Sequence, residues 1–145
     1  MPPLSRWFVR SGFIALALAL ALELVLARPA TLWPTLPDLA LERGAVHLMT
    51  VGWLLQVMTG VAFWMFPRHR THPPRGDARL GWAALVLLDT GLLIRVVAEP
   101  WRLGYGGPAW PLELSALLQL AAVGCIVPLL WPRIRGLSGG GATGD

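Results

Sequence analysis

Four apolar segments dominate the sequence, and each has the length of a membrane-spanning helix. They cover about residues 11–27, 44–66, 80–98 and 112–131. A helix needs about 20 mostly apolar residues to cross the hydrocarbon core, and lipid offers no hydrogen-bond partners to exposed backbone groups. Charged residues make up only 14% of the chain, against about a quarter in soluble domains. We predict an all-α, integral membrane four-helix bundle with a single domain over residues 1–135 and a flexible glycine-rich tail over 136–145.

The remaining composition excludes several classes of protein. All twelve basic residues are arginine. They lie mostly at the ends of the apolar segments and do not form the basic stripe of a nucleic-acid-binding protein. The single cysteine, Cys125, cannot form a disulfide within the chain. The sequence has no Walker loop, HExxH, GxSxG or CxxC motif. We therefore expect no nucleic-acid partner and no catalysis by this chain on its own.

The arginines also predict the orientation in the membrane. Eight of the twelve lie in the N-terminal segment, the second loop and the C-terminal end: Arg6, Arg10, Arg68, Arg70, Arg75, Arg79, Arg133 and Arg135. Because cytoplasmic loops are enriched in arginine and lysine, both termini are expected in the cytoplasm. Tryptophans near the ends of the segments fit interfacial belts: Trp7, Trp33, Trp64, Trp82, Trp101, Trp110 and Trp131. We expect a multi-pass protein of the cytoplasmic membrane of a prokaryote, with the lipid bilayer as its main partner.

The first segment has an alternative interpretation. Arg6 and Arg10 followed by the apolar run 13–22 could form a cleaved signal peptide. Against cleavage, Glu23 interrupts the apolar region and no small-x-small cleavage site follows it. The interpretation as a first membrane span is therefore preferred.

Polar residues within the spans are the candidates for function, because each is costly in lipid. They are Glu23, His47, Thr50, Gln56, Thr59, Asp89, Thr90, Arg95, Ser115 and Gln119. A neutral imidazole such as that of His47 is a good ligand for haem iron. Gly44, Gly52 and Gly60 recur every eight residues, with Gln56 between the last two. Small residues of this kind admit either a flat macrocycle or a neighbouring helix.

The stretch His47-Leu48-Met49-Thr50-Val51-Gly52-Trp53, continuing through Gly60 to Trp64-Met65-Phe66-Pro67-Arg68, resembles a helix of haem–copper oxidase subunit I. The likeness is to the nitric-oxide-reductase and cbb3-like branch, and to haem- and copper-containing membrane proteins of the nitric-oxide response. In these families the histidine is an axial ligand of the low-spin haem. The resemblance implies that His47 takes this role. Gly91-Leu92-Leu93-Ile94-Arg95 in the third segment extends the likeness weakly.

The chain also departs from these families. Their subunits have many more helices, a second axial histidine and further histidines for copper. Here the other histidines, His69 and His72, lie in the loop on the opposite side of the membrane from His47. The chain alone therefore cannot build an oxygen- or nitric-oxide-reducing centre. A second ligand could be His47 of a second copy, a methionine such as Met49 or Met58, or absent; a two-fold dimer would supply it by symmetry.

Two charged residues of the third span have open interpretations. Asp89 near its middle is a proton relay, a cofactor contact or, preferred here, a packing residue hydrogen-bonded to Thr50, Thr59 or Gln119. Arg95 lies four residues before Glu99, so the two can pair on one helix face. It is either an interfacial anchor or a bidentate partner for a haem propionate.

Three functions follow from these observations. The leading one is a small membrane haem protein of respiratory electron transfer or nitrogen-oxide metabolism, acting as a homodimer or within a larger respiratory complex. Its proposed cofactor residues are His47, Gly44, Gly52, Gln56 and Arg95. The second is a cofactor-free accessory or assembly subunit of an oxidase or reductase. The third is an oligomeric channel or transporter subunit with Asp89 lining the pore. Ser115 and Gln119 are expected to make hydrogen bonds between helices.

Overall fold

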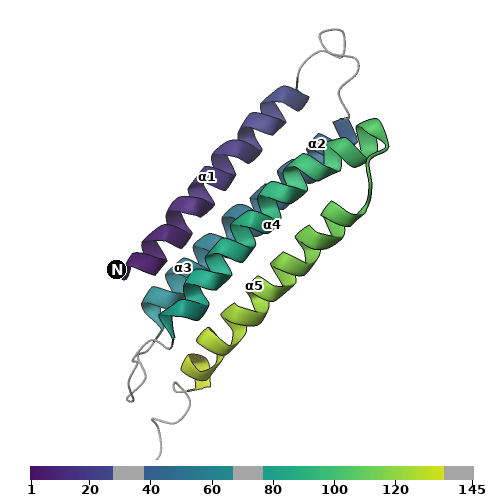
Figure 1. Cartoon of the computed structure of the whole chain (residues 1–145). Coiled ribbons are helices and arrows are strands. Elements are labelled where there is room, and N and C mark those ends of the chain that lie inside the picture. Colours follow the sequence, from purple (N-terminus) through teal and green to yellow (C-terminus); the bar gives the residue numbers. More distant parts are fainter. Residues whose placement is uncertain (28–37, 67–76, 136–145) are drawn as a thin grey trace, which may run out of the picture.

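The protein is all-helical, as predicted, with four helical spans that cross the molecule from end to end (Figure 1). The structure is a computed structural model that describes residues 1–27, 38–66 and 77–135. Its elements are α1 (Pro3–Leu26), α2 (Asp38–His47), η1 (Leu48–Leu55), α3 (Gln56–Met65), α4 (Ala78–Tyr105) and α5 (Trp110–Arg135). The α2, η1 and α3 segments follow one another without a break and together form the second span. Each span is long and apolar enough to cross a membrane.

Several predicted features lie outside the described residues. They are the loop arginines Arg28, Arg68, Arg70 and Arg75, the histidines His69 and His72, the residue Trp33, and the tail 136–145. The beginning of α1 and the end of α5 lie at the same end of the bundle (Figure 1). We call this the terminal end, and the other the opposite end.

The helices extend beyond the predicted apolar segments. The third segment was predicted to end at about residue 98, but α4 continues through Pro100 to Tyr105. A proline removes one backbone hydrogen bond, and membrane helices tolerate this loss where neighbouring groups compensate. The helix ends instead at Gly106, whose φ of 68° is readily adopted only by a residue without a Cβ. Arg102 then donates from Nη1 to the carbonyl of Gly107 at 2.9 Å.

The second span contains a π-helix, which the sequence pattern did not predict. It covers the eight residues of η1, between His47 and Gln56. A π-turn closes its hydrogen bonds over five residues instead of four. Side chains after η1 are therefore rotated relative to those of a regular α-helix, which changes the angles around the helix axis between Gly44, Gly52 and Gly60. Such segments occur frequently at functional sites.

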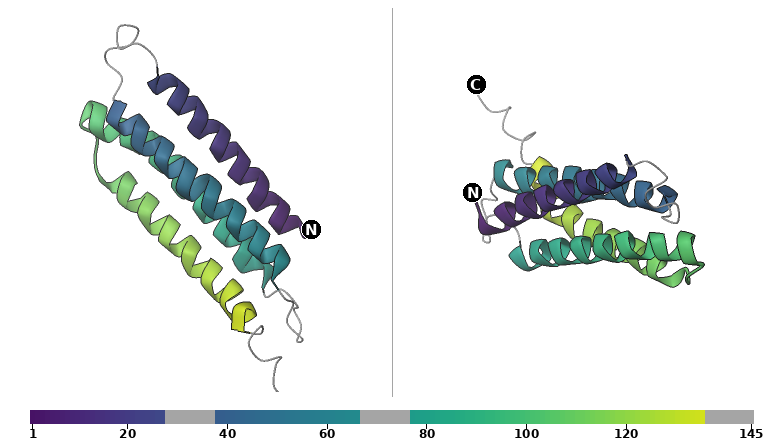
Figure 2. Two further views of the ribbon diagram at one scale, coloured as in Figure 1. Left: turned by 180° about the vertical axis from the view of Figure 1, so that it is seen from behind. Right: turned by 90° about the horizontal axis from the view of Figure 1, so that it is seen from above.

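The four spans pack as two helical hairpins. In the first, α1 runs along the whole second span; in the second, α5 packs against α4. The two hairpins meet where α4 contacts α2, η1 and α1, while α3 touches α5 only slightly. As a result α1 and α5 lie on opposite sides of the molecule (Figure 2).

Glycines allow the first hairpin to pack closely. A Cβ on Gly52 would lie 2.7 Å from the Cβ of Ala15 in α1, and one on Gly60 would lie 2.9 Å from the Cβ of Phe8. Both distances are shorter than a van der Waals contact. The space freed by these two glycines is thus occupied by α1, as in other membrane proteins with small residues at helix contacts.

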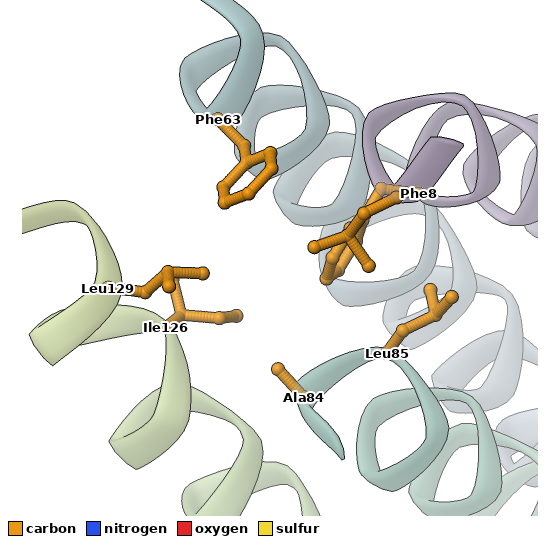
Figure 3. Close-up of a cluster of buried hydrophobic side chains, with 7 residues drawn as sticks. Phe8, Phe63, Ala84, Leu85, Ile126 and Leu129 are labelled. Carbon is orange, nitrogen blue, oxygen red and sulfur yellow. The ribbon is translucent and has the colours of Figure 1, made fainter. Parts of the chain in front are cut away.

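A buried apolar cluster joins all four spans near the terminal end (Figure 3). It consists of Leu4, Phe8, Phe63, Ala84, Leu85, Ile126 and Leu129. A smaller cluster of Ala15, Ala19 and Leu48 lies further toward the opposite end. These two clusters pack the helices together, and the polar groups of the spans lie between the clusters or closer to the opposite end.

Arg133 is buried beside the terminal-end cluster, although its position near the C-terminus suggested an exposed arginine. Its side chain donates from Nη2 to the carbonyl of Phe63 at 3.0 Å and to the carbonyl of Phe66. The guanidinium carbon lies 5.3 Å from the centre of the Phe63 ring. Because carbonyls at a helix C-terminus lack partners within the helix, Arg133 caps α3 and ties α5 to the first hairpin.

Candidate functional site

His47 is half-buried and lies at the edge of the buried face of α2. That face buries Ala40, Gly44 and Ala45. The half-buried His47 lines a groove of about 300 Å³ together with Leu39, Glu42, Arg43 and Val46. All of these residues belong to α2. Among the described residues no other element lines the groove, so a macrocycle bound to His47 would lie against α2.

The imidazole of His47 is oriented by its own helix. Its Nδ1 lies 3.0 Å from the carbonyl oxygen of Arg43, one turn earlier. In the tautomer that makes this bond, Nδ1 donates its proton and Nε2 keeps its lone pair. Histidines that bind metal through Nε2 commonly have this arrangement. Among the described residues, Nε2 of His47 has no hydrogen-bond partner.

The other residues predicted to hold a cofactor are not gathered around His47. Gly44 is buried near Leu22 and Glu99, and Gly52 is covered by Ala15 of α1. Gln56 is fully buried and donates to Asp89. Arg95 pairs with Glu99 on α4. Of the five residues predicted to hold a cofactor, only His47 is among the described residues that line the groove. The positions of the five along their helices follow from the sequence, but the face on which each side chain lies does not.

Asp89 is the centre of a polar cluster that links three spans. Its carboxylate accepts a hydrogen bond from the hydroxyl of Ser11 in α1, which lies 2.7 Å from both oxygens. It also accepts from Nε2 of Gln56 in α3 at 2.6 Å. Asp89 thus makes hydrogen bonds between helices, as the preferred interpretation expected, but the predicted partners, Thr50, Thr59 and Gln119, are wrong.

The three predicted partners have other environments. Thr50 is exposed and donates to the carbonyl of Val46 within its own helix at 2.8 Å. Thr59 is buried in α3. Gln119 donates to Ser115 at 3.0 Å, and Ser115 donates to the carbonyl of Gly91 in α4 at 2.7 Å. The predicted hydrogen bond between helices is thus confirmed for Ser115, and it holds α5 to α4.

A cavity of about 240 Å³ lies beside Asp89, between α1 and α4. Its walls are mainly apolar side chains, with Ser11 and Asp89 as its polar members: Ser11, Ile14, Ala15, Leu18, Leu48, Asp89, Leu92 and Leu93. Ile14, Leu18 and Leu93 are themselves exposed on the outside of the helices. The Asp89 cluster is therefore reached from the surface that would face lipid. Sequence reasoning missed Ser11, because a serine at the beginning of an apolar segment gives no sign of its partner.

Glu99 and Arg95 form a second polar group, toward the opposite end. Arg95 Nη2 lies 3.2 Å from Glu99 Oε1, which confirms the expected pairing across one helical turn. The burial of Glu99 was not foreseen: its side chain is only 3% exposed, against 22% for Arg95. Glu99 Oε2 and Arg95 Nε have no hydrogen-bond partner among the described residues. The carboxylate faces α2 close to Gly44.

Among the described residues, no group of three histidine, cysteine, aspartate or glutamate side chains could hold a metal ion. A haem iron needs only one or two protein ligands, so His47 is the candidate for haem ligation within this part of the chain. No protein-family model, curated protein or solved structure matches the chain. The chain is a four-span helical protein with the length and composition of a multi-pass membrane protein.

Proposed function

We propose that the protein is a small membrane haem-binding subunit of respiratory electron transfer or nitrogen-oxide metabolism, with His47 as an axial ligand. The observation that carries the proposal is the state of the His47 ring: Nδ1 is held by the carbonyl of Arg43, and Nε2 is directed to no partner in the described chain. The resemblance of residues 47–68 to the haem-binding helix of oxidase subunit I supports the same role.

The groove at His47 offers part of what a haem requires. Leu39 and Val46 provide apolar contacts, and the exposed Arg43 provides a guanidinium that can pair with a propionate. Gly52, Gln56 and Arg95 do not fit this role, because each is engaged inside the chain. When bound, the haem would supply an iron that accepts and releases one electron.

The proposed haem would lie at an interface between two protein surfaces. The described lining of the groove comes from α2 alone, and we propose that a second protein surface completes the site. A second copy of the chain would bring a second His47 by two-fold symmetry. The sequence orientation rule places this site near the non-cytoplasmic surface, since both termini are proposed to be cytoplasmic.

The test is the absorption spectrum of the full chain, purified in detergent from cells supplied with a haem precursor. We expect a Soret band in the wild type, its loss in His47→Ala, and its retention in Thr50→Ala. Thr50 is a matched control because it is exposed and bonds only to its own helix. A colourless wild type, or a His47→Ala variant with an unchanged band, would refute the assignment. Half a haem per chain supports the symmetric dimer; one haem per chain rejects the dimer.

A cofactor-free accessory subunit is the second candidate. The observation that favours it is that side chains of α1 occupy the space beside Gly52 and Gly60. These two glycines are therefore used for packing within the chain and leave no room there for a cofactor. The same purification separates the two functions. A colourless protein that copurifies with oxidase or reductase subunits supports the accessory role.

A further inference from the structure

The cluster of Asp89, Ser11 and Gln56 is independent of the His47 groove, and its chemistry differs from that of an ion pair. We propose that Asp89 is a reversible proton-binding site in the middle of the membrane, reached through the cavity between α1 and α4. This role goes beyond haem binding, and it requires neither a haem nor a second copy of the chain.

The hydrogen-bond partners of Asp89 can serve either of its protonation states. The hydroxyl of Ser11 donates to the carboxylate as observed, and the same hydroxyl can rotate to accept a proton from a carboxylic acid. The amide of Gln56 donates through Nε2, and after a half-turn of the amide its oxygen would accept instead. Neither partner forces the carboxyl to stay charged.

No fixed positive charge holds Asp89 in its anionic form. Its bonds within the described chain are those to Ser11 and Gln56. No charged side chain of α1, of the second span or of α5 pairs with it in this part of the chain. On α1, Arg10 is exposed and lies over the Trp7 ring at 5.9 Å. On α4, Arg95 is engaged with Glu99. A carboxylate without a counter-charge is costly in hydrocarbon, and uptake of a proton removes that cost.

The unused acceptor of Gln56 points to the same exchange. Its Oε1 is buried and has no hydrogen-bond partner among the described residues. An unpartnered buried acceptor costs about 1–3 kcal/mol. Turning the amide would bring this oxygen to a protonated Asp89 and give it a donor. Nε2 would then take the unpartnered position, so Gln56 can serve either protonation state of Asp89 at a similar cost.

The cavity leaves room for a proton donor beside Asp89. Its volume of about 240 Å³ exceeds the space of about 30 Å³ taken by one water molecule. A proton delivered by water adds to one carboxylate oxygen of Asp89, forming the O–H bond of a neutral acid and leaving the donor as its conjugate base. Release reverses this step. No oxidant or reductant is consumed.

The test is infrared spectroscopy of the full chain in liposomes, with difference spectra recorded between about pH 5 and pH 9. We expect a carboxylic-acid C=O band that grows as the pH falls and is absent in Asp89→Asn. In Ser11→Ala the band should remain and change frequency, because one hydrogen-bond partner is lost. Glu99→Gln is the matched control and should leave the band unchanged, since Glu99 has a fixed partner.

A second measurement does not depend on the folding of any variant. Dicyclohexylcarbodiimide, which is apolar, adds to protonated carboxyls exposed to lipid. In the wild type we expect mass spectrometry to place the label on Asp89, with more label at lower pH. A band that is absent at every pH, together with no labelling, would show a permanent carboxylate and overturn the proposal. A band of constant size at every pH would show a permanent acid and overturn it equally. The state of the His47 site affects neither outcome.

Discussion

Asp89 and Glu99 are both carboxylates of α4, ten residues apart, yet they are accommodated in different ways. Glu99 is 3% exposed and has a permanent partner in the guanidinium of Arg95. Asp89 lies beside a cavity and has only neutral partners, Ser11 and Gln56. The comparison shows that burial alone does not define the role of an acidic residue in a membrane span. The partner decides whether its charge is fixed or exchangeable.

The largest effect is expected from breaking the fixed pair. Arg95→Met leaves Glu99 buried without a counter-charge, which should lower the free energy of unfolding by about 3 kcal/mol. Unfolding of the purified protein in mixed detergent, titrated with dodecyl sulfate, measures this loss. Adding Glu99→Gln to Arg95→Met should restore part of the stability, because the unpaired charge is removed. A double variant less stable than Arg95→Met would contradict the pairing.

A methyl group added near the cavity at Asp89 should destabilise the protein more than a methyl group added near Glu99. Gly52 contacts Ala15, which lines the cavity at Asp89, and a Cβ there would clash at 2.7 Å. A Cβ on Gly44 would lie 4.0 Å from Glu99 Oε2, an ordinary contact. Gly52→Ala should destabilise by about 1–3 kcal/mol, and Gly44→Ala by much less. Equal losses in the same unfolding titration would show that α1 is not held closely against η1.

A smaller effect is expected from removing one neutral partner of Asp89. Ser11→Ala deletes the hydroxyl that contacts both carboxylate oxygens and should lower the unfolding free energy by about 1 kcal/mol. Ser5→Ala is the matched control on the same helix, because Ser5 Oγ is buried and has no hydrogen-bond partner among the described residues. It should be neutral or stabilising. If Ser5→Ala costs as much as Ser11→Ala, the hydrogen bond to Asp89 contributes little.

The sequence predicted the parts of this structure that depend on local composition. Four long apolar segments are sufficient to predict four helices, and a spacing of four residues is sufficient to predict the Arg95–Glu99 pair. The hydrogen bond from Ser11 to Asp89 joins residues 78 positions apart, and no local pattern encodes it. The π-helix η1 was missed for a related reason, since its mostly apolar residues resemble those of any span and the sequence did not show that η1 packs against α1.

The burial of Arg133 shows a further limit of sequence reasoning. Counting arginines gives the expected orientation of a span but does not distinguish a loop arginine from one that caps a neighbouring helix. Arg133 does the latter, through the carbonyls of Phe63 and Phe66. Likewise, the sequence identified His47 but not the groove that it lines on α2, which came from the structure alone.

Haem ligation by His47 can be tested by adding ferric haem to the purified, haem-free protein and following the Soret band. We expect a shift of the band that saturates in the wild type and in Thr50→Ala and is absent in His47→Ala. The reason is that Nε2 of His47 has no hydrogen-bond partner among the described residues, while Nδ1 is held by the carbonyl of Arg43. Identical titrations of wild type and His47→Ala would contradict the claim.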